Sequence, residues 1–181
     1  MPRAPGQRAG LSRDAVLGAA GEVLAERGVT GLSMRAVAAH LGVAPNALYS
    51  HVASKDELVD VLLDDVLAAI ECPHPDDDPR AGLTAVMTAT HELLLTRSDL
   101  VPLYLARQGS RGPRARALGA SMEVLLERAG VTDASSAVRV LVVHAIGSAA
   151  FVGGDGPLDV DDVRASFAAG LDWLLRGILT E

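Results

Sequence analysis

The side chains of one short stretch in the first third of the chain are suited to contact nucleic acid. The stretch carries an amide, a small apolar group, a phenol, a hydroxyl and an imidazole, at Asn46, Ala47, Tyr49, Ser50 and His51. Amides can pair with base edges, small apolar groups can pack on thymine methyls, and hydroxyls can bind phosphates. These residue types therefore predict a DNA-contacting surface. The alternative is a helical hairpin whose tyrosine and histidine are ordinary surface residues.

Two helices joined by a tight turn could display that stretch. Apolar residues recur at helical spacing at Val37, Ala38 and Leu41. Ser33 precedes them, and its side chain can accept a hydrogen bond from the first backbone N–H groups of a helix. Gly42 predicts the end of that helix, because glycine readily adopts the left-handed conformation of a short turn.

The second helix is expected to start directly after the turn. Pro45 suits its beginning, because the first N–H groups of a helix have no partner within the helix. Leu48 and Val52 are four residues apart and should face inward together. Their burial would leave the polar side chains on the outer face, which is the arrangement of a helix-turn-helix.

The motif resembles that of the TetR (tetracycline repressor) family of transcriptional regulators. The matching residues are Gly31, the run Ser33-x-Arg35-x-Val37-Ala38-x-x-Leu41-Gly42-Val43, and the run Leu48-Tyr49-x-His51-Val52-x-x-Lys55-x-x-Leu58. A bare helix-turn-helix pattern arises often by chance, and the second run makes this resemblance specific.

The resemblance implies DNA-binding roles for individual residues. Tyr49 and Lys55 match positions that anchor family members to phosphates, and Asn46 and Ala47 match positions that face bases. The predicted DNA-binding residues are Ser33, Arg35, Ala44, Pro45, Asn46, Ala47, Tyr49, Ser50, His51 and Lys55.

Two further helices should flank the motif. The first is expected to open at Ser12 or Asp14 and to close at Gly28, with an inward face made of Val16, Ala20, Val23 and Leu24. The other should start at a capping box in which Ser54 and Glu57 satisfy each other's backbone donors. Leu58, Val61, Leu62, Val66 and Ile70 continue it on one face. The resemblance implies that this fourth helix links the DNA-binding head to a sensor body.

Composition favours an all-α protein of two parts. Hydrophobic residues make up 49% of the 181 residues and aromatic residues only 3%, so the core must be aliphatic and alanine-rich. We expect a head over residues 1–53 and an effector-binding and dimerisation domain over residues 54–181. Charge is divided unevenly: residues 1–58 carry five Arg and one Lys against five acids, and the remainder carries ten basic and eighteen acidic residues. The acids thus lie mostly outside the predicted DNA-binding part.

The chain has no sign of a membrane or secretory segment. The apolar stretch from Val140 to Gly154 contains His144 and is shorter than the roughly 20 residues of a membrane span. We therefore expect a cytoplasmic protein with no membrane partner. The single cysteine, Cys72, excludes an intramolecular disulfide, and we expect it to be an ordinary, partly buried thiol.

The second part should be a bundle of four or five helices after the fourth. Breaks are predicted at Ser98, around residues 109–113, at residues 130–133 and at residues 153–159. Residues 134–152 are apolar nearly all round, so this segment must be covered on several sides. This segment and the last helix, which starts at about Asp161, are expected to form a four-helix bundle with the same two helices of a second copy. The resemblance implies the same site, because this family dimerises there.

No arrangement of residues predicts catalysis. A Gly-x-Ser-x-Gly elbow is absent, and the five histidines lack the spacing of a metal site. We therefore expect no enzyme, no metal and no cofactor.

An apolar interior with a few polar groups predicts a ligand pocket in the body. Its candidate residues are His91, Tyr104, Arg107, Gln108, His144 and Trp173, although each alone could be an ordinary core or surface residue. The segment from Leu94 to Gln108 also resembles the sensor domain of the family's tetracycline-binding members. Tyr104 stands where those members carry a metal-coordinating histidine, which argues against a magnesium–tetracycline complex.

Two classes of function remain. The first is a repressor that binds a palindromic operator as a homodimer and is released by a small-molecule effector. The second is a helical-bundle binding protein that keeps the head only as a structural relic. An enzyme is a third reading, which the absence of an arranged nucleophile or base disfavours.

Overall fold

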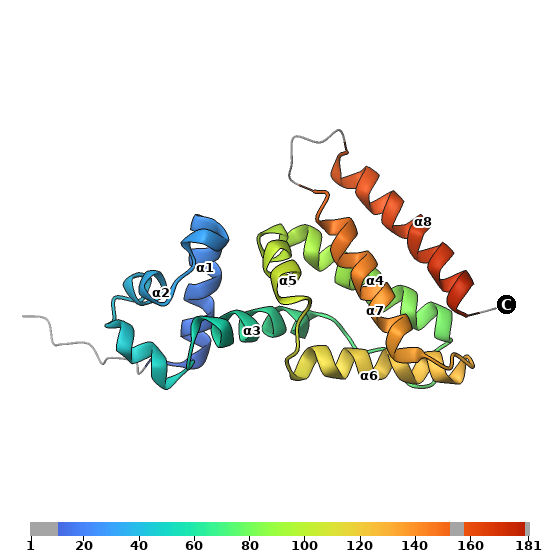
Figure 1. Cartoon of the computed structure of the whole chain (residues 1–181), viewed down its shortest axis with the longest axis horizontal. Coiled ribbons are helices and arrows are strands. Elements are labelled where there is room, and N and C mark those ends of the chain that lie inside the picture. Colours follow the sequence, from blue (N-terminus) through green and yellow to red (C-terminus); the bar gives the residue numbers. More distant parts are fainter. Residues whose placement is uncertain (1–10, 153–157, 180–181) are drawn as a thin grey trace, which may run out of the picture. The chain divides into compact units, whose positions relative to one another are not determined.

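Every regular element in the part of the chain that the structure describes is a helix. A computed structural model describes residues 11–152 and 158–179, and no strand occurs among them. The chain divides into two compact units, with the boundary between Leu62 and Leu63 (Figure 1). The first unit, which we call the head, holds α1 (Arg13–Gly31), α2 (Met34–His40) and a 3₁₀ helix, η1 (Pro45–Ser50). Helix α3 (Lys55–Asp65) crosses the boundary.

The head has a small aliphatic core. The Ser12 side chain accepts a hydrogen bond from the Ala15 N–H at 3.1 Å, so Ser12 rather than Asp14 caps α1. The predicted inward residues Val16, Ala20, Val23 and Leu24 are all fully buried. Gly28 has a φ of 66° and interrupts the helical backbone. The helix was predicted to end at this residue, and α1 has a kink there.

The helix-turn-helix has the local chemistry that the sequence predicted. Ser33 caps α2 by accepting from the Ala36 N–H at 3.1 Å. Gly42 has a φ of 67°, and the Val43 N–H then donates to the Ala38 carbonyl, which closes the turn. The second element is tighter than an α-helix, because the Ala47 N–H donates to the carbonyl of Ala44, three residues before it.

The capping box of α3 differs in one bond from the expectation. The Glu57 N–H donates to the Ser54 side chain at 3.1 Å, as predicted. The Glu57 carboxylate accepts from the Ala53 N–H at 2.6 Å, not from the Ser54 N–H. Helix α3 then ends at Asp65 and continues as a 3₁₀ turn, η2 (Val66–Ala69). Leu58, Leu62 and Ile70 on the predicted face are buried.

The second unit, which we call the body, is built around α7. Its elements are α4 (Pro79–Thr96), η3 (Ser98–Leu100), α5 (Val101–Arg107), α6 (Pro113–Arg128), α7 (Ala134–Ala149) and α8 (Val160–Ile178). Helix α7 contacts α4, α5, α6 and α8 (Figure 1). The prediction that this apolar segment is covered on several sides is therefore confirmed.

Two other expectations concern the surface of the body. Cys72 is exposed on the loop between η2 and α4, so the expectation of a partly buried thiol was wrong. Among the described residues, no helix is long and apolar enough to cross a membrane.

Candidate DNA-binding surface and ligand cavity

The outer face of η1 carries three exposed polar side chains on a buried anchor. Leu48 is fully buried and Val52 nearly so, which fixes the inner face. Asn46, Tyr49 and Ser50 are exposed, and Tyr49 is the largest of them, with 52% of its surface accessible. An exposed aromatic side chain next to an amide gains little from intramolecular packing, and this pair is available to a partner.

The other predicted DNA-binding residues lie at the ends of the same elements. Arg35 is exposed in the first turn of α2, and Ala44 and Pro45 are exposed at the start of η1. Ala47 and His51 are half-buried. Two hydroxyls already have intramolecular partners: Ser33 caps α2, and the Ser50 hydroxyl donates to the Ala47 carbonyl at 2.8 Å.

Lys55 begins α3 and is exposed. Its positive charge adds to that of the helix N-terminus. The two together favour a bound phosphate, although the helix dipole by itself disfavours a cation at this end. The neighbouring acid Glu57 is occupied, since its carboxylate accepts from the Ala53 N–H and lies 3.6 Å from Arg13. Glu22 is likewise paired with His40 at 2.6 Å. These pairings leave the positive charge of Lys55 exposed near η1.

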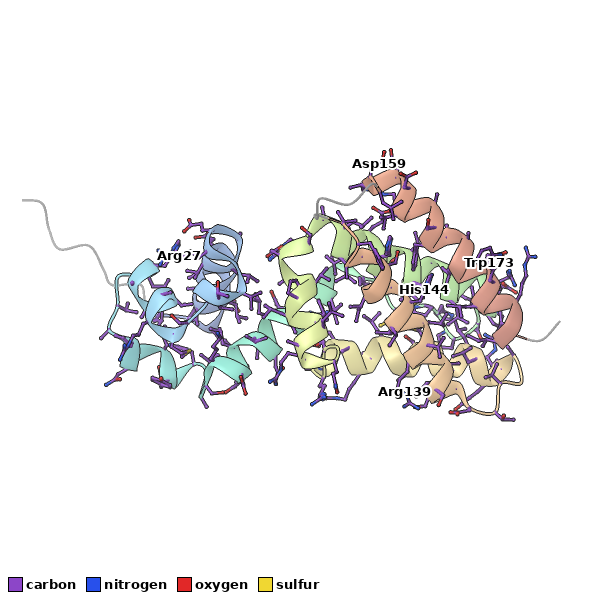
Figure 2. The ribbon with its side chains drawn as sticks, turned by 45° about the horizontal axis from the view of Figure 1, so that its top comes forward. Arg27, Arg139, His144, Asp159 and Trp173 are labelled. Carbon is purple, nitrogen blue, oxygen red and sulfur yellow. The ribbon has the colours of Figure 1, made fainter. Side chains whose placement is uncertain are left out.

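The body contains a cavity of about 690 Å³. It lies within the size range of small-molecule sites, which is roughly 300–1,000 Å³. Its wall is mostly aliphatic, with Val86, Met87, Leu94, Leu118 and Met122 among the residues from α4 and α6. Among the described residues that line it, Arg139 of α7 is the only one with a charge (Figure 2). The arrangement suits an apolar molecule with few polar groups.

Tyr104 and Gln108 are the two predicted ligand residues that line this cavity. The Tyr104 hydroxyl donates to the Leu63 carbonyl at 2.6 Å, so its ring rather than its hydroxyl is available to a ligand. Burial raises the pKa of Tyr104, with a smaller effect from the nearby Asp64 carboxylate. Gln108 ends α5 in the left-handed conformation, with a φ of 56°.

The two predicted ligand histidines are not at the cavity but in an aromatic stack. The ring of Phe167 on α8 stacks with both, with its centroid 3.9 Å from that of His91 and 5.0 Å from that of His144. His91 is hydrogen-bonded to the Ser148 hydroxyl, and His144 donates to the Phe167 carbonyl, each at 3.1 Å. Both histidines therefore join α4, α7 and α8, and neither lines the cavity.

Arg107 and Trp173 also lie outside the set of cavity residues. Trp173 is on α8 with 71% of its surface exposed (Figure 2). The structure thus places two of the six predicted residues at this cavity and the other four away from it, because helical position alone did not reveal which face each side chain occupies.

The sequence reasoning missed most of the cavity wall, including two glycines. Gly119 of α6 and Gly147 of α7 line the cavity, and a Cβ atom added at either would meet nothing within 4 Å. Glycine inside a helix is unfavourable by about 1 kcal/mol relative to alanine. A glycine in the middle of a predicted helix was therefore only a partial signal, because Gly18, Gly82 and Gly177 are also inside helices and do not line the cavity. Among the described residues, no group of three or more His, Cys, Asp or Glu side chains could hold a metal ion.

A helix-turn-helix head on an all-helical body with an apolar cavity defines a class of bacterial regulators. Residues 16–62 match the model of the family described as bacterial regulatory proteins, tetR family. The HTH-type transcriptional repressor DrrR1 of Streptomyces coeruleorubidus is 33% identical over 148 residues, which cover 80% of this chain and 54% of that protein. The head therefore carries a TetR-family N-terminal domain, and the similarity to named repressors of this kind continues into the body.

Two solved structures extend the similarity over both units. A structure of BioQ with its natural double-stranded DNA operator has a TM-score of 0.76 and 25% identity, covering 94% of this chain and 99% of that one. A TetR variant from Acinetobacter baumannii AYE in complex with minocycline has a TM-score of 0.80 and 28% identity, covering 92% and 96%. By contrast, the chain spans only 54% and 59% of the length of two curated relatives.

The stack around Phe167 predicts a pH dependence of stability. The structure lowers the pKa of His91, chiefly through burial, with His144 and Arg164 acting in the same direction against Glu92. The unfolded chain then binds a proton more readily than the folded chain, so stability is complete above about pH 6.5 and falls as the pH decreases below it. We expect the melting temperature to decrease between about pH 7.5 and pH 5.5, and to decrease less in His91→Gln.

The exposed His74 offers the matched control. His74→Gln should keep the full pH dependence of the wild-type chain. An identical dependence in His91→Gln and wild type would show that another group is responsible.

Proposed function

We propose that this chain is a DNA-binding transcriptional repressor that binds a palindromic operator as a homodimer and releases it when a small molecule occupies the body. The observation that carries the proposal is the exposed face of η1, where Asn46 and Tyr49 stand on the buried Leu48 within the residues that match the family. The description of DrrR1 as a transcriptional repressor and the BioQ–operator structure support the same function.

The head residues should divide into phosphate and base contacts. Tyr49 on η1 and Lys55 at the start of α3 are assigned to phosphates, and Asn46 and Ala47 are assigned to base edges in the major groove. Ser33, Arg35, Ala44, Pro45, Ser50 and His51 complete the proposed surface. Because phosphates repeat along DNA whatever its sequence, the two groups differ in what their loss should do.

Electrophoretic mobility shifts on the DNA upstream of the chain's own gene, with a salt titration, test this division. Tyr49→Ala and Lys55→Ala should weaken binding to all sequences alike. Asn46→Ala should lose about 1–3 kcal/mol only at particular base pairs. Arg27→Ala is the matched control, because it removes one positive charge from an exposed site on α1 (Figure 2).

The same experiment separates the two classes of function. Absence of specific binding by the wild-type chain would favour a helical-bundle binding protein whose head is a relic. A change of sequence preference in Lys55→Ala, with nonspecific affinity intact, would overturn the assignment of Lys55 to phosphate.

Dimerisation through α7 and α8 is supported by apolar side chains that the body leaves in solvent. Trp173 on α8 and Val140 on α7 are 71% and 45% exposed. On α8, the exposed Ser166 and Gly177 share the face of Trp173 at helical spacing and would let a second copy approach closely. An apolar patch of this kind is typical of a protein–protein interface.

Sedimentation of the purified chain tests the dimer. The wild type should sediment as a dimer, and Trp173→Asp should be mostly monomeric, since a charge would be buried without a partner. Val124→Asp is the matched control, because Val124 is an exposed apolar residue of α6. A monomeric wild type, or a dimeric Trp173→Asp, would contradict the proposed interface.

The proposed effector is a largely apolar molecule that occupies the cavity. Tyr104 and Gln108 are its proposed contacts among the residues named from the sequence, together with the aliphatic wall. The A. baumannii neighbour binds minocycline, which supports a small-molecule ligand in this fold. His91, Arg107, His144 and Trp173 are not proposed as ligand contacts, because none of them lines the cavity.

Filling the cavity should abolish ligand binding without unfolding the body. N-phenyl-1-naphthylamine, a neutral dye that fluoresces in apolar surroundings, is a suitable probe. Gly119→Leu should weaken its binding at least about tenfold, because the new side chain extends into the cavity without a clash at its Cβ. Gly18→Leu in α1, where an added Cβ also meets nothing within 4 Å, is the matched control. Equal dye binding by all three proteins would contradict the cavity as the ligand site.

A further inference from the structure

Asp64 is a buried carboxylate that its own helix disfavours. It is 6% exposed. Among the described residues, His91 is the only other buried polar or charged side chain. It lies in the last turn of α3, beside Asp65 and with no basic residue in that turn. A negative charge at this end of a helix is unfavourable, because the helix dipole is negative there. Groups outside α3 must therefore stabilise the Asp64 carboxylate.

The N-terminus of α6 provides those groups. The N–H groups of Arg114 and Ala115 donate to the Asp64 carboxylate at 3.1 and 2.9 Å, and the Ser110 hydroxyl lies 3.4 Å from it. The N-cap residue of α6 is Gly112, which has no side chain to accept these bonds. Asp64 is thus the cap of a helix that begins about fifty residues later in the chain, and its charge favours the positive end of that helix.

Gly112 leaves the space that this cap requires. A Cβ atom added at Gly112 would lie 2.1 to 2.4 Å from the carboxylate atoms of Asp64. The Gly112 backbone has a φ of −73°, which any residue can adopt. The contact with Asp64 is therefore the reason for glycine at this position.

A second bond ties the end of α3 to the cavity wall. The carbonyl of Leu63, one residue before Asp64, accepts the hydroxyl of Tyr104 at 2.6 Å. Tyr104, Ser110 and Ala115 all line the cavity. Two successive residues of α3 are therefore bonded to groups on α5, on the loop before α6 and on α6 itself, all of which a ligand would touch.

We propose that Asp64 is a positioning residue that couples occupancy of the cavity to the orientation of α3. A ligand that displaces Ser110 or Ala115 must either move the carboxylate or break its hydrogen bonds. Because α3 is one uninterrupted α-helix from Lys55 to Asp65, a displacement of its last turn is transmitted along the helix. This inference rests on the proposed function, since it concerns the regulation of the same cavity.

Amide hydrogen exchange of the full chain, followed by NMR, tests the tie in the absence of DNA. Asp64→Ala should accelerate exchange at Arg114 and Ala115 about tenfold, and should also accelerate exchange in the last turn of α3. Asp64→Asn keeps one acceptor oxygen and should show a smaller effect. The control is Asp133→Ala, because Asp133 caps its own helix α7. Its effect should stay within the first turn of α7. An effect of Asp64→Ala confined to α6 would make Asp64 a local cap and overturn the proposal.

Gly112→Ala perturbs the same contact from the other side. It should reproduce the exchange pattern of Asp64→Ala, because the new methyl group displaces the carboxylate. In the Asp64→Ala background it should have little further effect, since nothing remains to displace. Additive effects of the two substitutions would overturn the tie.

Operator DNA then tests the coupling. Because coupling between two sites is reciprocal, operator binding should change exchange at Arg114 and Ala115 about fivefold or more in the wild type, and not in Asp64→Ala. Operator binding without this change would overturn the coupling and leave the proposed regulator intact. A wild type that binds no operator would overturn the proposed function, and with it the coupling, whereas the DNA-free exchange would still report the tie.

Discussion

The body depends on one packing constraint, which is the burial of a helix that is apolar nearly all round. Helix α7 must be covered on most sides, and α4, α5, α6 and α8 all contact it. With only 3% aromatic residues in the chain, aliphatic and small side chains do the covering. Glycines at positions 119 and 147 then leave volume unfilled between α6 and α7. The cavity follows from how α7 is covered, and a ligand would complete the packing that the chain omits.

Local chemistry made the head predictable from the sequence. Ser12 and Ser33 cap their helices, Gly42 adopts a positive φ, and Leu48 and Val52 are buried at the predicted spacing. Each of these features depends on residues within one or two turns of the chain. The 3₁₀ geometry of η1 was not predictable, because six residues between a proline and the next turn can adopt either helical form with the same side chains facing outward.

The body was predictable in its helix boundaries and not in its contacts. Proline and glycine mark where its helices begin and end, and the observed breaks follow them. Which polar residues meet in space depends on the rotation of each helix about its axis. His91 and His144 therefore both stack with Phe167, while Trp173 faces solvent and Tyr104 lines the cavity. The sequence does not show which face of its helix a tyrosine, a histidine or a tryptophan occupies.

Residues that contradict their own element are the exception to this rule. Two aspartates end α3, where the helix dipole favours cations, and α6 and α7 each contain a glycine away from any turn. A residue whose conformational preference agrees with its helix needs no contact from elsewhere in the fold to stabilise it. A residue that conflicts with its helix indicates a compensating contact elsewhere. Asp64 finds that contact at the N-terminus of α6, and the glycines border the cavity. Both conflicts lie in or beside the cavity wall, whereas other helical glycines, such as Gly18 in α1 and Gly177 in α8, lie away from it.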